Sequence, residues 1–142
     1  MPQSAHIPGV LNKPTTTPEG DRPTFTGGVG LNMLHKHIPD EKISADFPAS
    51  AALVNFEPCA RTNWHWHEKG QLLTVTKGRG WICDKGGKPK SIQAGDVIWC
   101  PPDTTHWHGA DDGSEMMHMA FSMGGVEWLD EVTDAEYAAK TS

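Results

Sequence analysis

The chain has 142 residues, enough for one domain with its own hydrophobic core. Its 12 basic and 18 acidic side chains give a formal charge of −6, which argues against a role in binding nucleic acid or an anionic membrane surface. There is no basic run and no apolar stretch of ~20 residues, so neither a signal peptide nor a transmembrane helix is expected. Three cysteines without C-x-x-C spacing favour reduced thiols in the cytoplasm.

The first 24 residues are rich in proline and threonine and poor in apolar side chains. Such a composition buries little surface, so residues 1–24 are predicted to form an extended or disordered arm. The arm either lies across a partner subunit or is a free terminus. Residues 25–142 are predicted to form a single domain.

Short runs of β-branched, aromatic or alternating residues follow, bounded by glycine, proline or aspartate. They predict strands at 29–35, 51–56, 71–76, 80–84, 90–93, 96–100 and 115–122. Lys85-Gly86-Gly87-Lys88 predicts a hairpin turn. Many short strands at close spacing, with no long helical period, indicate an all-β sandwich or barrel. Thr133 and Glu136 fit a capping box that opens a short helix over about 134–140.

Two histidines precede the strand-like run that begins at Gln71. Residues two apart in a strand share a face, so His65 and His67 can direct both imidazoles to one point, and Gln71 has the same parity. A His-x-His pair is more commonly two half-exposed strand residues. His35 and His37 repeat the spacing without a similar context, so we predict that they lie outside the site.

A second motif runs from Gly95 to His106 and predicts a strand that ends in a proline-rich turn presenting another histidine. With His65, His67 and Gln71, it supplies three neutral imidazoles and one side-chain oxygen. Such a set binds a divalent metal and leaves coordination positions open.

The full motifs are His65-x-His67-x3-Gln71-x6-Gly78 and Gly95-x5-Pro101-x-Asp103-x2-His106. In order and spacing they resemble the paired motifs of the cupin superfamily, over roughly residues 50–125. The resemblance implies an all-β barrel, the double-stranded β-helix or jelly roll, with a metal held inside by His65, His67, Gln71 and His106. Gln71 stands where most cupins have glutamate, and Asp103 where many have glycine.

Further segments narrow the resemblance to one bacterial subgroup. They are Phe56-Glu57-Pro58, Ala60-Arg61-Thr62, His106-Trp107-His108-Gly109-Ala110, Trp128, Val132-Thr133-Asp134 and Tyr137. The subgroup includes manganese-dependent cupin hydroxynitrile lyases, whose metal ligands are three histidines and a glutamine. The resemblance implies one divalent ion per chain, with Mn²⁺ favoured and Fe²⁺, Zn²⁺ or Ni²⁺ as alternatives. It also supports a catalytic role for His118, since the lyases have a histidine at the matching position.

Alternation along the strands predicts the side chains that line the barrel. Ala52, Val54 and Phe56 share one face of their strand, and Ser122 shares a face with His118. We expect these residues to form a substrate pocket. An inward His118 is an uncoordinated imidazole suited to acid–base work, and the alternative is a core histidine bonded to a neighbour.

Four aromatic or imidazole side chains near the motifs have other expected roles. His108 has the parity of His106 and is expected either to orient a metal ligand from behind or to be exposed. Trp64, Trp66 and Trp107 alternate with the histidines, so they are expected to face away from the metal and to serve packing or a subunit interface.

Four neutral ligands leave a divalent ion its full +2 charge, which favours Lewis-acid chemistry on a bound alkoxide. Together with this chemistry, the resemblance implies a metal-dependent lyase of the hydroxynitrile type, which cleaves or forms cyanohydrins or acts on a related small hydroxy or carbonyl compound. Two alternatives stay open: a quercetinase-like cupin dioxygenase, and a non-catalytic cupin that binds a metal or a small molecule. A homodimer is also expected, because the tryptophans, the arm and the tail helix are available to cover exposed sheet edges.

Overall fold

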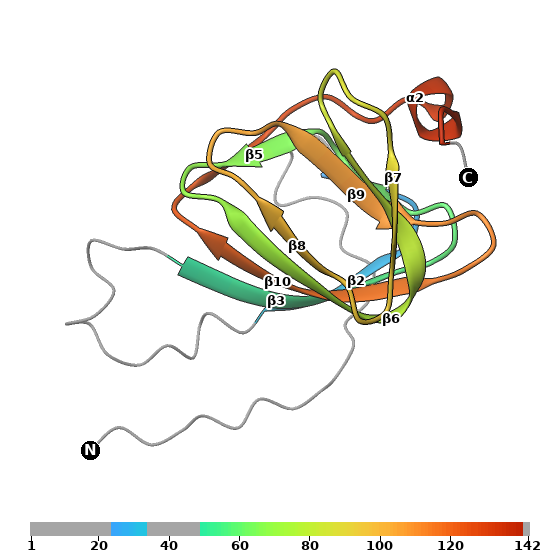
Figure 1. Cartoon of the computed structure of the whole chain (residues 1–142), viewed down its shortest axis with the longest axis horizontal. Helices are drawn as coiled ribbons and strands as arrows, with labels where there is room; N and C mark the ends of the chain where they lie inside the picture. The colour runs from blue at the N-terminus through green and yellow to red at the C-terminus, as the bar shows by residue number, and fades with distance from the viewer. Residues whose placement is uncertain (1–23, 34–48, 141–142) are drawn as a thin grey trace, which may run out of the picture.

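The computed structural model describes residues 24–33 and 49–140, so nearly all of the predicted arm, and both His35 and His37, lie outside the described residues. The described part is an eleven-stranded sheet that curves round on itself, with a short helix at its C-terminal end (Figure 1). The elements are β1 (Phe25–Thr26), β2 (Val29–Met33), β3 (Ala49–Phe56), β4 (Arg61–Thr62), β5 (His65–His67), β6 (Gln71–Asp84), β7 (Lys90–Gln93), β8 (Val97–Cys100), β9 (His106–Ala110), β10 (Met116–Met123), β11 (Val126–Trp128) and α2 (Asp134–Ala138).

The long strand β6 joins the two halves of this sheet. Its first half pairs with β8 and β10, and the sheet continues from β10 through β3 to β2. Its second half pairs with β7 and β9, and β9 pairs in turn with β4 and β5. All of these pairings are antiparallel. Because one strand belongs to both halves, the halves form the walls of a barrel, as the strand pattern predicted.

Gly78 marks a bend within β6 and not the end of a strand. The sequence predicted two strands separated at Gly78, whereas β6 is continuous from Gln71 to Asp84. Gly78 adopts φ +73°, and the pairing of β6 with β10 shifts register close by, between Met117 and His118. A glycine inside a strand often marks a bulge of this kind, because glycine takes positive φ without a steric penalty. The bend lets β6 pass from one half of the barrel to the other.

Strand β9 has no counterpart among the predicted strands. All five of its residues are buried, so it lacks the alternation of apolar and polar side chains by which a strand is usually found. It pairs with β6 on one side and with β4 and β5 on the other. β9 is a central strand with few β-branched residues. Its extended conformation is therefore set by pairing with the neighbouring strands and not by its own composition.

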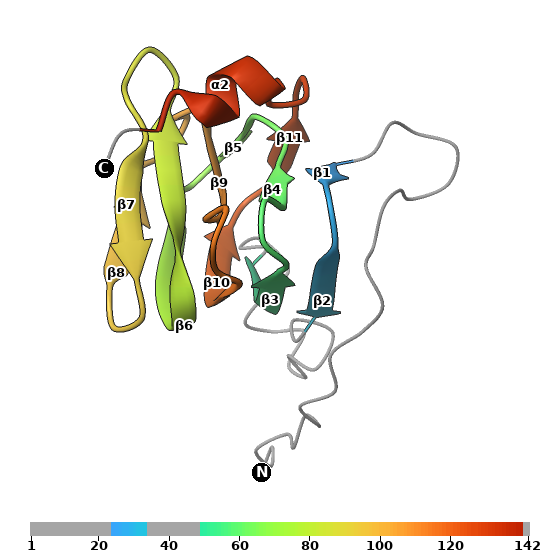
Figure 2. The same cartoon turned by 90° about the vertical axis from the view of Figure 1, so that its right-hand side faces the viewer.

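The predicted helix is present as α2 and ends at Ala138, slightly earlier than expected. Its capping box is complete, since Glu136 N donates to Thr133 Oγ1 at 3.0 Å and Thr133 N donates to Glu136 Oε1 at 2.9 Å. Figure 2 shows α2 lying across the ends of β6 and β9. None of the helices in the described ranges is long and apolar enough to cross a membrane.

A second hydrophobic cluster, outside the barrel, holds α2 in place. It comprises Trp64, Trp81, Cys83, Trp107, Val132 and Tyr137. Trp64 and Trp107 therefore serve packing, as predicted from their alternation with the histidines. The buried Arg61 ties the same region together, because its Nη2 donates to the Val132 carbonyl at 3.0 Å and to Asp134 Oδ1 at 2.8 Å. This packing fixes β5, which carries His65 and His67, and β9, which carries His106 and His108.

Candidate metal centre and cavity

A cavity of about 290 Å³ lies inside the barrel and is lined by both apolar and titratable side chains. The predicted pocket residues Ala52, Val54 and Ser122 are among its lining. Phe56 is not. It is fully buried behind the histidines, with its ring centroid 5.9 Å from that of His108 and 5.3 Å from that of His118. Phe56 faces inward, as its place in the alternating pattern predicted, but its position at the end of β3 places it in the packed interior.

Four histidines, His65, His67, His108 and His118, line this cavity, and a fifth, His106, packs against them. Three strands supply the five. His65 and His67 come from β5, His106 and His108 from β9, and His118 from β10. His65 is paired directly opposite His106 across the two strands, and their ring centroids are 4.4 Å apart. All five side chains are buried. The register of β5 against β9 thus brings together imidazoles that are some forty residues apart in the sequence.

Backbone carbonyls fix the proton positions on two of these rings. His65 Nδ1 lies 2.9 Å from the Asn63 carbonyl, and His106 Nδ1 lies 3.0 Å from the Thr104 carbonyl. A carbonyl oxygen only accepts, so in each ring the hydrogen is on Nδ1, and a neutral ring then has a lone pair on Nε2. Metal-binding histidines are commonly oriented by this kind of bond to the backbone.

Gln71 brings an oxygen to the same point. Its side chain is buried at the start of β6, and its Nε2 donates to Ser122 Oγ at 3.0 Å. This turns Gln71 Oε1 towards His106, where it lies 3.2 Å from Nε2. Both facing atoms carry lone pairs, and a cation between them would satisfy both. Both ring nitrogens of His67 are also buried without a hydrogen-bond partner among the described residues. The donor set therefore fits a divalent metal.

The tightest histidine group is different from the predicted ligand set. His65, His106 and His108 each offer one ring nitrogen, and these three atoms lie within 4.8 Å of one another, so this triad could hold a metal ion. The sequence analysis placed His108 behind the ligands. His65 and His106 belong to both sets, whereas the assignment of His67 and Gln71 as the remaining ligands stays a prediction.

A hydrogen bond between His108 and His118 links the roles of these two residues. His118 Nε2 lies 3.0 Å from His108 Nδ1, while His108 Nε2 and His118 Nδ1 have no partner among the residues that the structure describes. If the hydrogen of this bond is on His118, a neutral His118 has a free lone pair on Nδ1, and a neutral His108 has a hydrogen on Nε2. If the hydrogen is on His108, the positions are reversed. In the neutral pair, His118 can therefore act as a base at Nδ1 only when His108 is not a ligand through Nε2.

Burial keeps all five rings neutral. Desolvation is the largest cause of the lowered pKa of each histidine, and it brings the pKa of His67 and of His118 to about 4. For His65, the next cause is repulsion from His106, and for His108 it is repulsion from His118. At neutral pH the ring nitrogens are therefore available as ligands or as bases without first losing a proton.

The metal-free protein is expected to lose stability as the pH falls from about 6.5 to 4. An unfolded histidine takes up a proton near pH 6.5, whereas folded His67 and His118 do so only near pH 4. In that window the unfolded state binds more protons, and each of the two residues costs on the order of 3 kcal/mol by pH 4. Urea denaturation at pH 7.0 and pH 4.5 tests this, with His67→Gln expected to show a smaller loss. A free energy of unfolding that is equal at both pH values would contradict the prediction.

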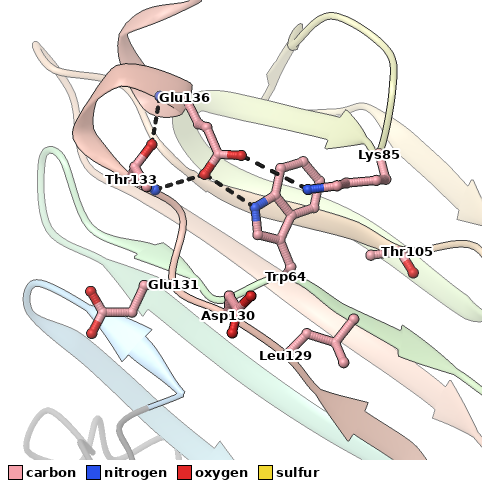
Figure 3. A pocket seen from close by; sticks show the side chains of 8 residues that line it. All are labelled: Trp64, Lys85, Thr105, Leu129, Asp130, Glu131, Thr133 and Glu136. Atoms are coloured by element: carbon pink, nitrogen blue, oxygen red, sulfur yellow. Dashed lines mark hydrogen bonds and ion pairs between the residues drawn. The ribbon is translucent and has the colours of Figure 1, made fainter.

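A second hollow of about 380 Å³ lies outside the barrel beside α2 (Figure 3). Two of its charged side chains pair with each other, because Lys85 Nζ lies 3.9 Å from Glu136. Both also contact Trp64: Glu136 accepts from Trp64 Nε1 at 3.4 Å, and Lys85 Nζ lies 4.3 Å above the Trp64 ring. None of the five clustered histidines lines it. This hollow is a packing feature of the helix, and the histidine cavity is the candidate site.

Comparison with known proteins agrees with the geometry. The cupin domain family matches residues 52–123, just over half of the chain. The chain belongs to the cupin family. An (R)-mandelonitrile lyase from Granulicella tundricola is 42% identical to this cupin over 123 residues, which cover 84% of the cupin and 89% of the lyase. The resemblance to small cupins of the hydroxynitrile-lyase kind is thereby confirmed.

Solved structures support the same fold. A cupin-like protein from Thermotoga maritima is 36% identical to this cupin, with a TM-score of 0.75 over 92% of this chain and 95% of that one. The polyketide cyclase RemF from Streptomyces resistomycificus has a TM-score of 0.65 over 98% of this cupin and 91% of its own chain. At 16% identity, the second likeness concerns the fold alone. The predicted all-β cupin barrel is confirmed.

Proposed function

We propose that this cupin is a metal-dependent lyase that cleaves or forms cyanohydrins. The observation that carries the proposal is the cavity inside the barrel. There Gln71 Oε1 faces the lone pair of His106 Nε2, and His118 lines the same cavity with an Nδ1 that has no partner among the described residues. The 42% identity to an (R)-mandelonitrile lyase supports the same reaction class. The substrate class proposed is a small hydroxynitrile, formed from an aldehyde and cyanide.

The proposed ligands are His65, His67, Gln71 and His106, with Mn²⁺ favoured and Fe²⁺, Zn²⁺ or Ni²⁺ as alternatives. All four side chains are neutral, so the site keeps the full charge of a divalent ion. When bound, that ion would supply Lewis-acid stabilisation of negative charge on the substrate oxygen. The backbone bonds to His65 and His106 would hold two of the rings in the required orientation.

The shape and lining of the cavity suit a small aromatic substrate. At about 290 Å³ it is at the small end of ligand pockets. Phe25 and Trp128 line it with their ring centroids 5.7 Å apart, and Trp128 also packs 4.5 Å from the His65 ring. An aryl group is accommodated by such walls, while its hydroxyl and nitrile groups remain near the histidines.

His118 is the proposed base. With its hydrogen on Nε2, His118 donates to His108 Nδ1, and its Nδ1 accepts the hydroxyl proton of the cyanohydrin. The carbon–carbon bond to the nitrile then breaks, its electron pair leaves with cyanide, and the carbonyl of the aldehyde forms. The proton on His118 is returned to cyanide, which is released as hydrogen cyanide. In the reverse direction the same nitrogen takes the proton from hydrogen cyanide.

The test combines metal analysis with a synthesis assay. Protein stripped with a chelator and reloaded with Mn²⁺ is expected to form mandelonitrile from benzaldehyde and cyanide, and stripped protein is expected to be inactive. The stripped protein serves as its own control for the uncatalysed addition. Stoichiometric metal without any lyase activity would overturn the proposal. In that case, oxygen uptake with a flavonol would support the dioxygenase, and its absence a binding role.

A further inference from the structure

The side-chain amide of Gln71 lies between two groups with different hydrogen-bonding capacities. On one side, its Nε2 donates to Ser122 Oγ at 3.0 Å. On the other side, its Oε1 lies 3.2 Å from Nε2 of His106, a ring whose hydrogen is held on Nδ1 by the Thr104 carbonyl. At Nε2 the neutral ring can only accept, whereas the serine hydroxyl can accept or donate. Ser122 is therefore the neighbour that can accept from the amide nitrogen while the amide oxygen faces the ring.

The strand register places the Ser122 hydroxyl beside this amide. Burial alternates along β10, so that His118, Ala120 and Ser122 all face inward. Strands β10 and β6 are neighbours in the barrel (Figure 1), and Ser122 is paired directly opposite Gln71. Directly opposed residues have their Cβ atoms ~5 Å apart, within reach of a hydrogen bond between two polar side chains. Both residues are buried, so this bond is made inside the barrel wall and away from bulk water.

The other neighbours of Gln71 offer no equivalent acceptor. The next inward pair along the same two strands is Leu73 and Ala120, and both side chains are apolar. On its other flank, Gln71 is opposite Cys100 of β8, whose thiol is a weak acceptor. Ser50 is opposite Ser122 in β3 and is therefore one strand further from Gln71. The acceptor that Gln71 Nε2 has among the described residues is the Ser122 hydroxyl.

We propose that Ser122 is a positioning residue for the metal centre. By accepting from Gln71 Nε2, it directs Oε1 to the point that His106 Nε2 also faces. The inference rests on the proposed role of Gln71 as a metal ligand and adds the group that orients this ligand. From its place in the alternating pattern, Ser122 was expected only to line the substrate pocket. Its hydrogen bond gives it a second role, in metal affinity.

Loss of the hydroxyl is expected to be most costly in the metal-bound protein. With Oε1 on the ion, Nε2 in a Ser122→Ala variant faces a methyl group and is buried without an acceptor, which is unfavourable. In the metal-free variant, the amide can rotate by ~180° and donate to the lone pair of His106 Nε2. That rotation leaves Oε1 facing the methyl group, but a buried carbonyl without a partner is tolerated better than a buried N–H. The substitution therefore lowers metal affinity.

The dissociation constant of Mn²⁺, measured by chelator competition on the full chain, tests this proposal. Ser122→Ala is expected to raise it ~10–100-fold, the range seen when the groups that orient metal ligands are changed. Ser122→Thr keeps a hydroxyl and is expected to restore binding close to that of the wild type. Ser50→Ala removes the same group from the adjacent strand and is expected to leave the dissociation constant unchanged. Urea denaturation of the metal-free proteins checks that each variant is folded.

A double-mutant cycle with Gln71→Ala separates positioning from a general effect on the cavity. If Ser122 acts through Gln71, Ser122→Ala is expected to cause no further loss of affinity in the Gln71→Ala background. An equal loss in both backgrounds, or an unchanged dissociation constant in Ser122→Ala, would overturn the proposal.

Two further outcomes would overturn the proposed metal centre together with the role of Ser122. One is a Gln71→Ala variant that binds Mn²⁺ as tightly as the wild type, and the other is a wild type that binds no Mn²⁺. Cyanohydrin turnover does not enter these measurements. A chain that binds Mn²⁺ but lacks lyase activity would therefore contradict the proposed reaction and still decide the role of Ser122.

Discussion

Replacing His118 with alanine is expected to reduce cyanohydrin turnover by ~10²–10⁴-fold while leaving the metal content unchanged. The reason is the position of the ring. His118 is fully buried, lines the cavity and is not part of the histidine triad that could bind metal, and its Nδ1 has no hydrogen-bond partner among the described residues. The measurement is the initial rate of mandelonitrile cleavage with metal determined in the same sample. Near-wild-type turnover in the metal-loaded variant would remove His118 from the mechanism.

His108→Ala is the matched comparison, because it removes the other half of the same hydrogen bond. Without His108, His118 keeps its free nitrogen but loses the acceptor at Nε2, so a smaller loss of turnover than for His118→Ala is expected. The apparent pKa of the rate profile is also expected to move in His108→Ala, since the hydrogen bond between His118 Nε2 and His108 Nδ1 is gone. A loss in His108→Ala equal to that in His118→Ala, with metal still bound, would contradict the assignment.

The second large effect is expected for His106→Ala, which should lose its metal and with it all activity. His106 belongs both to the predicted ligands and to the histidine triad, so the expectation does not depend on which set is correct. Removing one ligand of four is expected to weaken metal affinity more than ~100-fold, the upper limit seen when only the surroundings of ligands are changed. Elemental analysis of purified protein checks this. Full stoichiometric metal in His106→Ala would contradict both sets.

His67→Ala and His108→Ala then separate the two sets. If His67 is a ligand, its loss lowers metal content and the loss of His108 does not. If His108 is the third ligand, the reverse holds. The hydrogen bond between His108 and His118 gives this comparison a second readout, because a His108 that binds metal leaves His118 with a hydrogen on its free nitrogen. Measuring metal content and turnover in the same variants therefore tests the ligand set and the role of His118 together.

Much of the site could be predicted from the sequence because it depends on local rules. Alternation places His65 and His67 on one face, and the structure confirms that both are buried beside the cavity. The capping box around Thr133 is equally local, and α2 begins where it predicts. The paired motifs added a long-range prediction that local rules cannot make, namely that His106 lies close to His65 and His67 in the folded chain. The opposition of His65 and His106 across β5 and β9 bears this out.

The rest depended on how strands pair, which a single sequence does not specify. The closeness of His108 to His65 follows from the register of β9, a strand without an alternating pattern of its own. Phe56 has the inward parity that was predicted, but depth along the barrel decides that it packs behind the histidines.

The bend at Gly78 has a consequence for changes in chain length. Between Gln71 and Gly78, an inserted or deleted residue would exchange the two sides of β6, putting Leu72 into the cavity and Gln71 into the solvent. At the bulge, β6 already has one residue without a partner in β10. The number of residues there can therefore change without exchanging the inward and outward side chains of β6. Insertions in β6 are therefore best tolerated at one place, which separates the half of the strand that holds Gln71 from the half that supports α2.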